Sequence, residues 1–259
     1  MFIIFAITIF LLGVSIGSFF NLIIDRLKRK EKITGRSKCE KCHHALNFFD
    51  LFPVLSYVFL GGKCRYCKKR IGIQYLLIEL SVGLLFLVCF LTQFRDVENL
   101  AVITFSQILI FVRNLIVVTT CVSIFVYDIR YMEIPDEIVI PSSIIVLLIN
   151  IFLTRNYQVF LIGSVVGLFF FFSQFYLSKG KWIGGGDMRI GFLIGAIFGS
   201  LEYVFITIFL GYILGAIYSL PILFKKYVGK NKNVDNVVPL GPFLSVSILL
   251  VLFILRFFI

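Results

Sequence analysis

Four of the six cysteines form two pairs with the spacing Cys-x2-Cys. Cys39 and Cys42 make the first pair, Cys64 and Cys67 make the second, and 21 residues separate the two pairs. Each pair places two thiolates at one turn, so two pairs together complete a tetrahedral four-sulfur zinc site. The alternatives are a redox pair or free thiols, and the two histidines after Cys42 are alternative ligands. Because structural zinc sites are closed by four protein ligands, the pattern predicts zinc that supports folding rather than catalysis.

Two aspartates stand at the ends of apolar runs, where a carboxylate is costly and therefore informative. Asp128 ends the run that begins near residue 105, and Asp187 follows a stretch of three glycines. Two carboxylates that lie close together cannot both ionise at low cost, so one holds a proton while the other stays charged. That asymmetry suits general acid–base activation of a water molecule against a peptide carbonyl. Gly184 and Gly186 would let backbone or substrate approach without obstruction by side chains.

Simpler interpretations of these aspartates remain open on spacing alone. Asp128 could pair with Arg130, and Asp187 could N-cap a helix after a flexible glycine loop. Asp136 is a rival to Asp128 for the catalytic role. It follows Pro135 and precedes an apolar run, so N-capping of the next helix explains it adequately.

The elements that must position these residues are membrane-spanning helices. The chain has 259 residues, of which 59% are hydrophobic, whereas soluble domains are about 45–50% apolar. This composition excludes a soluble enzyme, a disordered chain and a disulfide-rich secreted domain. Because a spanning helix needs about 20 mostly apolar residues, we expect about eight spans, near residues 2–24, 72–94, 105–127, 138–154, 158–177, 188–200, 202–224 and 237–256.

The distribution of basic residues predicts the orientation of the spans. With the N-terminus outside, the cytoplasmic segments hold 21 Lys and Arg residues, whereas the external side holds only Arg95, Arg155 and Arg256. Positive charge concentrates on the cytoplasmic side of membrane proteins. The same count explains the net charge of +11 without nucleic acid. The basic segments predicted to be cytoplasmic are 25–71, 128–137, 178–189 and 225–236.

Several motifs then make the chain resemble the type IV prepilin peptidases, bacterial membrane aspartyl proteases of the Gly-x-Gly-Asp kind. Residues 17–27, GSFFNLIIDRL, resemble the opening motif of that family, and residues 39–79 resemble its cysteine region. Asp128 with the sequence Ile-Pro-Asp at 134–136 resembles its first catalytic motif. Residues 184–187, GGGD, resemble its second, in which Gly184, Gly186 and Asp187 match.

The resemblance implies that Asp128 and Asp187 are the catalytic pair, since the family's first aspartate lies seven residues before the proline. It also implies cleavage of prepilin or pseudopilin leaders after a glycine, at the cytoplasmic face. Many members then methylate the new amino terminus with S-adenosylmethionine. The residues that would bind this cofactor are unknown; the polar candidates near the N-terminal cytoplasmic region are Asn21, Arg26, Asp50 and Glu79.

The sequence therefore predicts an all-α polytopic protein of the bacterial cytoplasmic (inner) membrane, with a small zinc-binding cytoplasmic insert. We expect a first transmembrane helix at 1–24, a zinc-knuckle domain at 25–71, two further helices within 72–127, and a peptidase core of about five helices with cytoplasmic catalytic loops at 128–259. The expected partners are prepilin or pseudopilin precursors and the lipid bilayer, and not nucleic acid. The alternatives are a peptidase without methyltransferase activity, an ion-coupled transporter that uses the aspartates as relay groups, and a zinc-stapled scaffold without chemistry.

Overall fold

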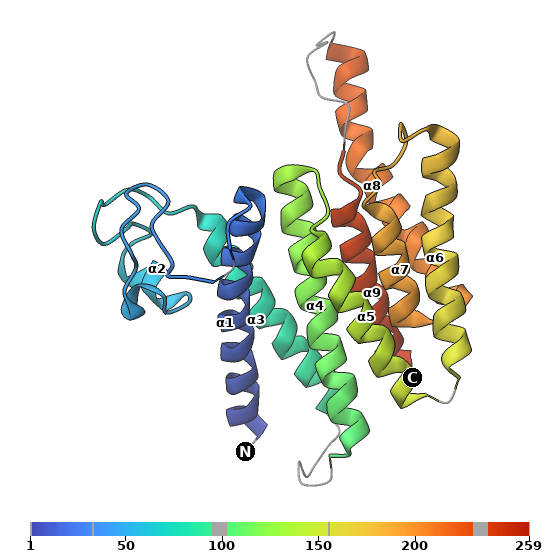
Figure 1. Cartoon of the computed structure of the whole chain (residues 1–259), viewed down its shortest axis with the longest axis horizontal. Coiled ribbons are helices and arrows are strands. Elements are labelled where there is room, and N and C mark those ends of the chain that lie inside the picture. Colours follow the sequence, from blue (N-terminus) through green and yellow to red (C-terminus); the bar gives the residue numbers. More distant parts are fainter. Residues whose placement is uncertain (1, 33, 95–102, 155, 230–237, 259) are drawn as a thin grey trace. The chain divides into compact units, whose positions relative to one another are not determined.

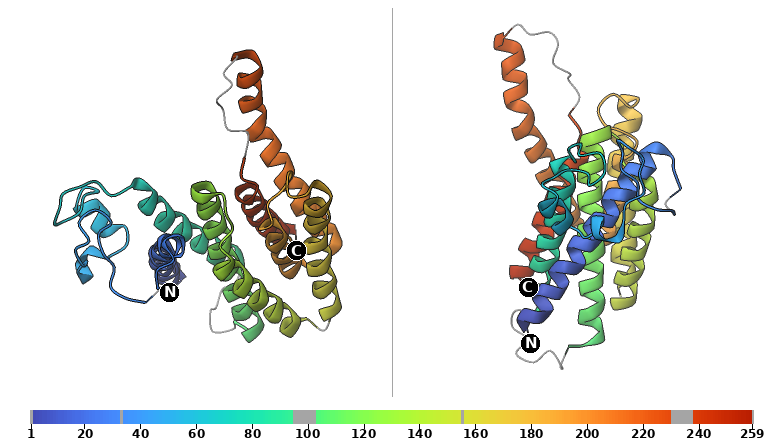
Figure 2. Two further views of the ribbon diagram at one scale, coloured as in Figure 1. Left: turned by 45° about the horizontal axis from the view of Figure 1, so that its top comes forward. Right: turned by 90° about the vertical axis from the view of Figure 1, so that its left-hand side faces the viewer.

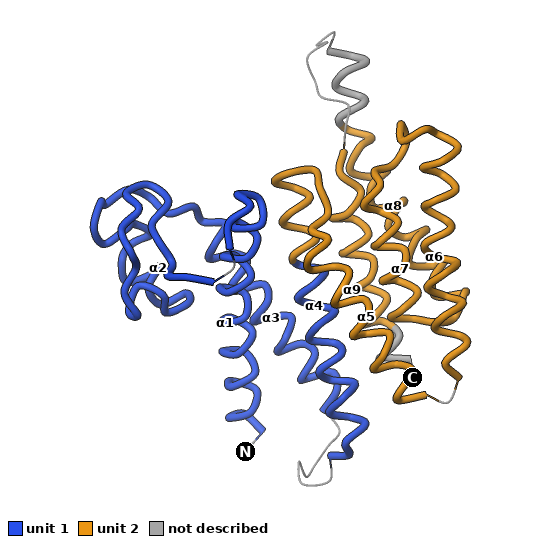
Figure 3. The backbone as a smooth tube through the Cα atoms, viewed as in Figure 1, with its two compact units in different colours: residues 1–122 blue, residues 123–259 orange. Residues whose placement is uncertain are grey.

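The computed structural model describes every residue except 1, 33, 95–102, 155, 230–237 and 259, and it leaves the side chains of 222–229 and 255–258 undescribed. The described residues are helical or irregular, with two isolated β-bridges as the only strand-like pairings among them. The chain divides into two compact units, residues 1–122 and residues 123–259 (Figure 3). The prediction of an all-α protein is confirmed.

The first unit is built on two long helices that approach each other closely. These are α1 (Phe2–Arg29) and α3 (Ile73–Phe94). A Cβ atom added at Gly13 would lie 2.9 Å from the Cα of Gly83, and one added at Gly17 would lie 3.0 Å from the Cα of Glu79. Small residues at such crossings allow backbones to pack directly in a membrane. Helix α4 (Phe105–Tyr131) begins in this unit and ends in the second.

A polar insert connects α1 to α3 (Figure 1). It contains both cysteine pairs, a short 3-10 helix η1 (Phe48–Asp50) and a short helix α2 (Leu55–Phe59). Because so small a segment has little core of its own, the backbone relies on turns. The two isolated bridges, between Lys38 and Ala45 and between Lys63 and Arg70, each close one of the cysteine turns.

The second unit is a bundle in which one short helix is covered by the others. Its helices are α5 (Asp136–Leu153), α6 (Tyr157–Ser178), α7 (Asp187–Phe198), α8 (Leu201–Gly229) and α9 (Gly241–Phe258). Helix α7 contacts α5, α6, α8 and α9, and Figure 1 shows it running beside α6. Gly191 and Gly195 of α7 face Gly163 and Gly167 of α6, where a Cβ atom on either helix would collide with the other backbone.

The expected number of eight spans is slightly too high. Within the described residues, six helices are long and apolar enough to cross a membrane, namely α1, α3, α4, α5, α6 and α8 up to Pro221, and a shorter apolar stretch covers Gly241–Ile254. The predicted span at 188–200 is α7, whose 12 residues extend about 18 Å, less than the roughly 30 Å hydrocarbon core. Gly199, which ends α7 with a φ of 67°, adopts a backbone conformation that favours glycine.

Two other predicted boundaries shift by a few residues. Helix α4 continues to Tyr131, so Asp128 lies within its last turn rather than in a loop. The N-cap of α5 is Pro135, and Asp136 is the first residue of the helix rather than its cap. The membrane orientation stays a prediction, and Arg95 and Arg155, which support it, lie outside the described residues.

Candidate active site and cysteine cluster

Asp128 is buried at the end of α4 and held there by the start of another helix. Its side chain belongs to a residue that is only 5% exposed. The backbone N–H of Gly241, the first residue of α9, donates a hydrogen bond of 2.9 Å to Oδ2 of Asp128. A Cβ atom at position 241 would lie 2.5 Å from the same oxygen, so only glycine allows this approach. The sequence analysis missed Gly241; its one signal is a Gly-Pro pair that precedes an apolar run.

Asp187 is buried at the first position of α7 and is held by its own loop. The residue is 6% exposed. The N–H of Gly184 donates a hydrogen bond of 3.0 Å to Oδ2 of Asp187, and the N–H of Asp187 donates back to the carbonyl of Gly184 at 3.2 Å. The loop between Gly184 and Asp187 is therefore a closed turn rather than a flexible linker. It fixes the carboxylate at the positive end of α7.

One apolar side chain, Ile134, lies against the glycines next to both aspartates. A Cβ atom at Gly186 would lie 2.8 Å from Cβ of Ile134, and a Cβ atom at Gly241 would lie 3.1 Å from Cδ1 of the same isoleucine. The structure thus brings Asp128, Asp187, Gly184 and Gly186 into one site inside the second unit.

Asp136, the rival of Asp128, points to a different partner. Its Oδ1 lies 2.8 Å from Nη1 of Arg189, and both side chains are about 40% exposed. An exposed ion pair of this kind contributes little to stability. Asp136 therefore forms an ion pair at the surface, whereas the carboxylate of Asp128 is buried.

The four predicted cysteine ligands converge in the first unit. The Sγ atoms of Cys39, Cys42, Cys64 and Cys67 all lie within 4.8 Å of one another. Those of Cys39 and Cys67 are 3.9 Å apart, close to the roughly 3.8 Å edge of a zinc tetrahedron with Zn–S bonds of 2.3 Å. The donor set and spacing fit a structural zinc ion, and the four thiolates leave no need for a histidine.

The two cysteine turns repeat the same backbone pattern. In the first, the N–H of His43 donates to the carbonyl of Cys39, and in the second the N–H of Lys68 donates to that of Cys64. His43 and Lys68 both have positive φ values, 55° and 59°. This repeat explains why Cys-x2-Cys spacing suffices to place two thiols together, because each turn is closed by its own hydrogen bonds.

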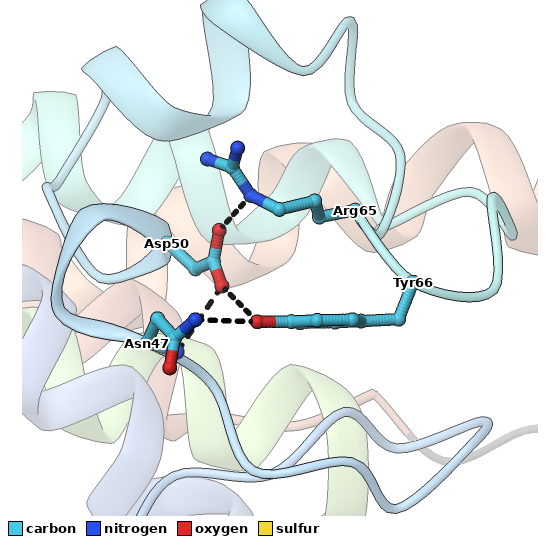
Figure 4. Close-up of polar contacts among 4 residues, drawn as sticks. All are labelled: Asn47, Asp50, Arg65 and Tyr66. Carbon is cyan, nitrogen blue, oxygen red and sulfur yellow. Dashed lines mark hydrogen bonds and ion pairs between the residues drawn. The ribbon is translucent and has the colours of Figure 1, made fainter.

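A polar group of four side chains braces the insert (Figure 4). Asp50 accepts hydrogen bonds from Nε of Arg65 at 2.6 Å and from the hydroxyl of Tyr66 at 3.3 Å, and Asn47 donates to that hydroxyl at 2.8 Å. Desolvation alone would raise the pKa of Asp50, but the hydrogen bond from Arg65 and the one from the N–H of Asn47 outweigh it, so the pKa lies below its usual range. The network ties the chain after the first cysteine pair to the second pair.

The other polar candidates named for a cofactor also have structural partners. Asn21 donates to the carbonyl of Tyr75, and the guanidinium of Arg26 donates to the carbonyls of Lys32, Gly35 and Arg36. Glu79 accepts a hydrogen bond from the N–H of Val54. The bond of Asn21 joins α1 to α3, and those of Arg26 and Glu79 hold the insert to these two helices, which explains why such polar residues are buried there.

Comparison with known proteins gives one consistent result. The family model described as "Bacterial Peptidase A24 N-terminal domain" matches residues 11–93, and the model described as "Type IV leader peptidase family" matches residues 115–220. The chain is 27% identical to the prepilin leader peptidase/N-methyltransferase of Vibrio cholerae, over 93% of each chain. It is also 27% identical to the proteins of that name from Pseudomonas putida and Pseudomonas aeruginosa, over 91% and 92% of this chain and 86% of each relative. No solved structure matches it significantly.

Proposed function

This chain belongs to the type IV leader peptidase family, and we propose that Asp128 and Asp187 are its peptidase centre. The observation that carries the proposal is a pair of buried carboxylates, each of which accepts a hydrogen bond from a glycine N–H. Ile134 lies against Gly186 beside one carboxylate and against Gly241 beside the other. The relatives are named as prepilin leader peptidases. We extend that substrate to this chain as prepilin or pseudopilin precursors, whose basic leaders precede an apolar segment.

The proposed mechanism needs only the two carboxyl groups and water. Burial and mutual repulsion favour a state in which one carboxyl is protonated and the other is ionised. The ionised group accepts a proton from the attacking water, while the protonated group donates its proton to the carbonyl oxygen of the scissile bond. As the C–N bond breaks, the carboxyl group that took a proton from water protonates the leaving amine. The other carboxylate takes a proton from a hydroxyl of the tetrahedral intermediate, so the pair ends in its starting charge state.

The fixed hydrogen bonds have a clear part in this scheme. Because Gly241 and Gly184 each donate to the Oδ2 atom of an aspartate, the Oδ1 atoms are the ones left for water and substrate. Donors that are already oriented need no reorganisation as charge moves. We propose that both glycines position the carboxylates without contacting the substrate.

The membrane supplies the rest of the arrangement. The chain is a multi-pass membrane protein of a bacterial family, and we propose the orientation given by the basic residues, with the N-terminus outside and the aspartates at the cytoplasmic face. A prepilin with a basic leader and an apolar helix would then reach the site by lateral diffusion.

The second activity in the relatives' names is N-methyl transfer. We propose it for this chain too, with S-adenosylmethionine as the methyl donor. Zinc is proposed for the cysteine cluster, where four thiolates would give a closed structural site.

Intact-mass analysis of a prepilin incubated with the purified protein in lipid tests this function. Wild type should release the leader, whereas Asp128→Asn and Asp187→Asn should not, and Asp136→Asn should cleave like wild type. Addition of S-adenosylmethionine should then raise the mass of the mature chain by that of a methyl group. Cleavage by Asp128→Asn but not by Asp136→Asn would transfer the role to Asp136. Cleavage without a gain in mass would leave the peptidase and remove the methyltransferase.

A further inference from the structure

The segment between the two cysteine pairs presents an unusual apolar surface. Residues 48–59 form η1, a turn and α2, and large apolar side chains along them point away from the insert. Phe49 is 72% exposed and Phe59 is 84% exposed. The exposed set is Phe48, Phe49, Leu51, Phe52, Leu55, Val58 and Phe59. So many exposed large apolar side chains on one short segment outside the long apolar helices are typical of an interaction site.

A hydrogen bond to α3 fixes the position of residues 48–59 along that membrane helix. The N–H of Val54, at the start of α2, donates a hydrogen bond of 2.8 Å to Oε2 of Glu79. Glu79 is the seventh residue of α3, inside the apolar candidate span Ile73–Phe94. The segment is therefore held beside the second turn of a membrane helix rather than beyond its end.

The neighbouring helix α1 supports the same position of the segment through Glu79. Glu79 packs against Gly17 of α1, and Gly17 precedes the basic residue Arg26 by nine positions, or about 13 Å along the helix axis. Basic side chains such as Lys28 and Arg29 mark the point at which α1 leaves the apolar region. Figure 1 shows α2 alongside the part of α1 that leads into the insert, below the upper end of that helix, and the left panel of Figure 2 shows the same insert from another side.

The positive charge next to residues 48–59 is complementary to an anionic membrane surface. Basic residues follow α2 closely, and they are Lys63, Arg65, Lys68, Lys69 and Arg70, all exposed. Aromatic and aliphatic side chains next to basic ones are typical of elements that lie in the membrane interface. Basic residues near such an element attract anionic lipid headgroups.

The contacts of Asp50 fix the orientation of residues 48–59 on the insert. Asp50 turns toward the second cysteine pair, where Arg65 and Tyr66 bind its carboxylate (Figure 4). Nearby, the ring of Phe48 makes edge-on contacts with those of Phe49 and Phe52, at centroid distances of 5.9 Å and 5.2 Å. The segment thus binds its polar side chain Asp50 within the insert and leaves the aromatic side chains exposed.

We propose that residues 48–59 are an interfacial anchor that inserts its apolar face into the lipid leaflet at the basic end of α1. The occupant of the surface is the bilayer itself, at the boundary of headgroups and acyl chains. The anchor holds the cysteine-containing insert against the membrane. This role is separate from the proposed peptidase centre, which lies in the second unit.

Tryptophan fluorescence in vesicles tests the anchor, because Trp182 is the one tryptophan of the chain. In a Trp182→Phe background, the full-length protein would carry either Phe59→Trp or Phe49→Trp, with Thr34→Trp as the matched control in the exposed loop after α1. The vesicles would contain phosphatidylglycerol and phosphatidylcholine, with or without bromine on the upper acyl-chain carbons.

We expect the tryptophans at 49 and 59 to emit at shorter wavelength than that at 34, and to lose most of their emission to brominated lipid but little to aqueous iodide. Thr34→Trp should show the reverse. Quenching of residues 49 and 59 by iodide alone would place the segment in water and overturn the proposal. Quenching by neither agent would show that protein covers it, from this chain or a second copy, and would also overturn it. Prepilin cleavage in the same vesicles reports on the peptidase separately.

Discussion

The cysteine cluster and the aspartate pair are two ways of assembling a site from distant residues. Each half of the cysteine cluster closes on itself, since the turns at Cys39 and Cys64 repeat the same local hydrogen bonds. The aspartate pair has no such local unit. Asp128 is held by a glycine 113 positions away in the sequence, and Asp187 is placed by a loop that a helix bundle supports.

This difference determines what each site depends on. A cluster made of local turns in a small insert depends on its ligands for stability, because little apolar surface is buried there. A pair of buried carboxylates depends on the packing of the bundle, and contributes chemistry rather than stability. The two sites should therefore respond in opposite ways to the same kinds of substitution.

The largest effects are expected from substitutions that remove one site and leave the other, either cleavage activity or zinc binding. Asp187→Asn should lower prepilin cleavage by at least about 10³-fold, since residues that act as a unit lose nearly all function together, yet it should keep the full zinc content. Cys64→Ser should lose the zinc and make the insert sensitive to protease, with a smaller loss of cleavage than Asp187→Asn. Elemental analysis, limited proteolysis and intact-mass cleavage measure the three quantities. Loss of zinc in Asp187→Asn would break the comparison.

A smaller effect is expected from the glycine that supports Asp128. In Gly241→Ala the added methyl group would meet Oδ2 of Asp128 and displace the carboxylate. Misplacement of a reacting group by an ångström costs about 10²-fold in rate. Gly215→Ala in α8 is the matched control, because its methyl group would come only to an ordinary contact distance of 3.4 Å from Phe243. Steady-state cleavage rates of the two variants, with melting temperatures, measure the difference, and equal rates would remove Gly241 from the site.

The pH dependence of cleavage should be bell-shaped. The proposed mechanism requires one protonated and one ionised carboxyl, so activity is lost at low pH when both are protonated and at high pH when both are ionised. Zinc binding should fall at low pH alone, because protons compete for the thiolates. Rates and metal content over one pH series compare the two sites directly. A cleavage rate that rises steadily to high pH would contradict a shared proton.

The smallest effect is expected at the exposed pair of Asp136 and Arg189. Its geometry is good, but exposed ion pairs contribute about 1 kcal/mol or less. Asp136→Asn should thus change the melting temperature slightly and leave the cleavage rate near that of wild type. A large fall in rate would restore Asp136 as a catalytic candidate.

The same contrast explains what could be predicted from the sequence. The cysteine ligands follow from spacing, because the turns that place them are local. The apolar runs predict most of the membrane helices, but hydropathy does not distinguish lipid from protein as the surrounding medium. Hydropathy therefore predicts a span at α7, although the 12 residues of this helix are covered by neighbouring helices.

The aspartate site required information that spacing does not contain. The residues alone left Asp128 and Asp136 as rivals, and the family motif selected Asp128. Gly241 could not be found in this way, since its function is a backbone N–H directed at a residue far away in the sequence. The exposed segment 48–59 was likewise missed, because its apolar residues indicate neither a span nor a core until its attachment to Glu79 is known.

A double-mutant cycle at the two carboxylates tests the central claim most directly. Cleavage rates of a prepilin would be measured for wild type, Asp128→Asn, Asp187→Asn and the double variant in lipid. If the two groups form one site, each single substitution should remove nearly all activity, and the double variant should be no worse than either. Independent losses that multiply in the double variant, or substantial activity in either single variant, would contradict a catalytic pair.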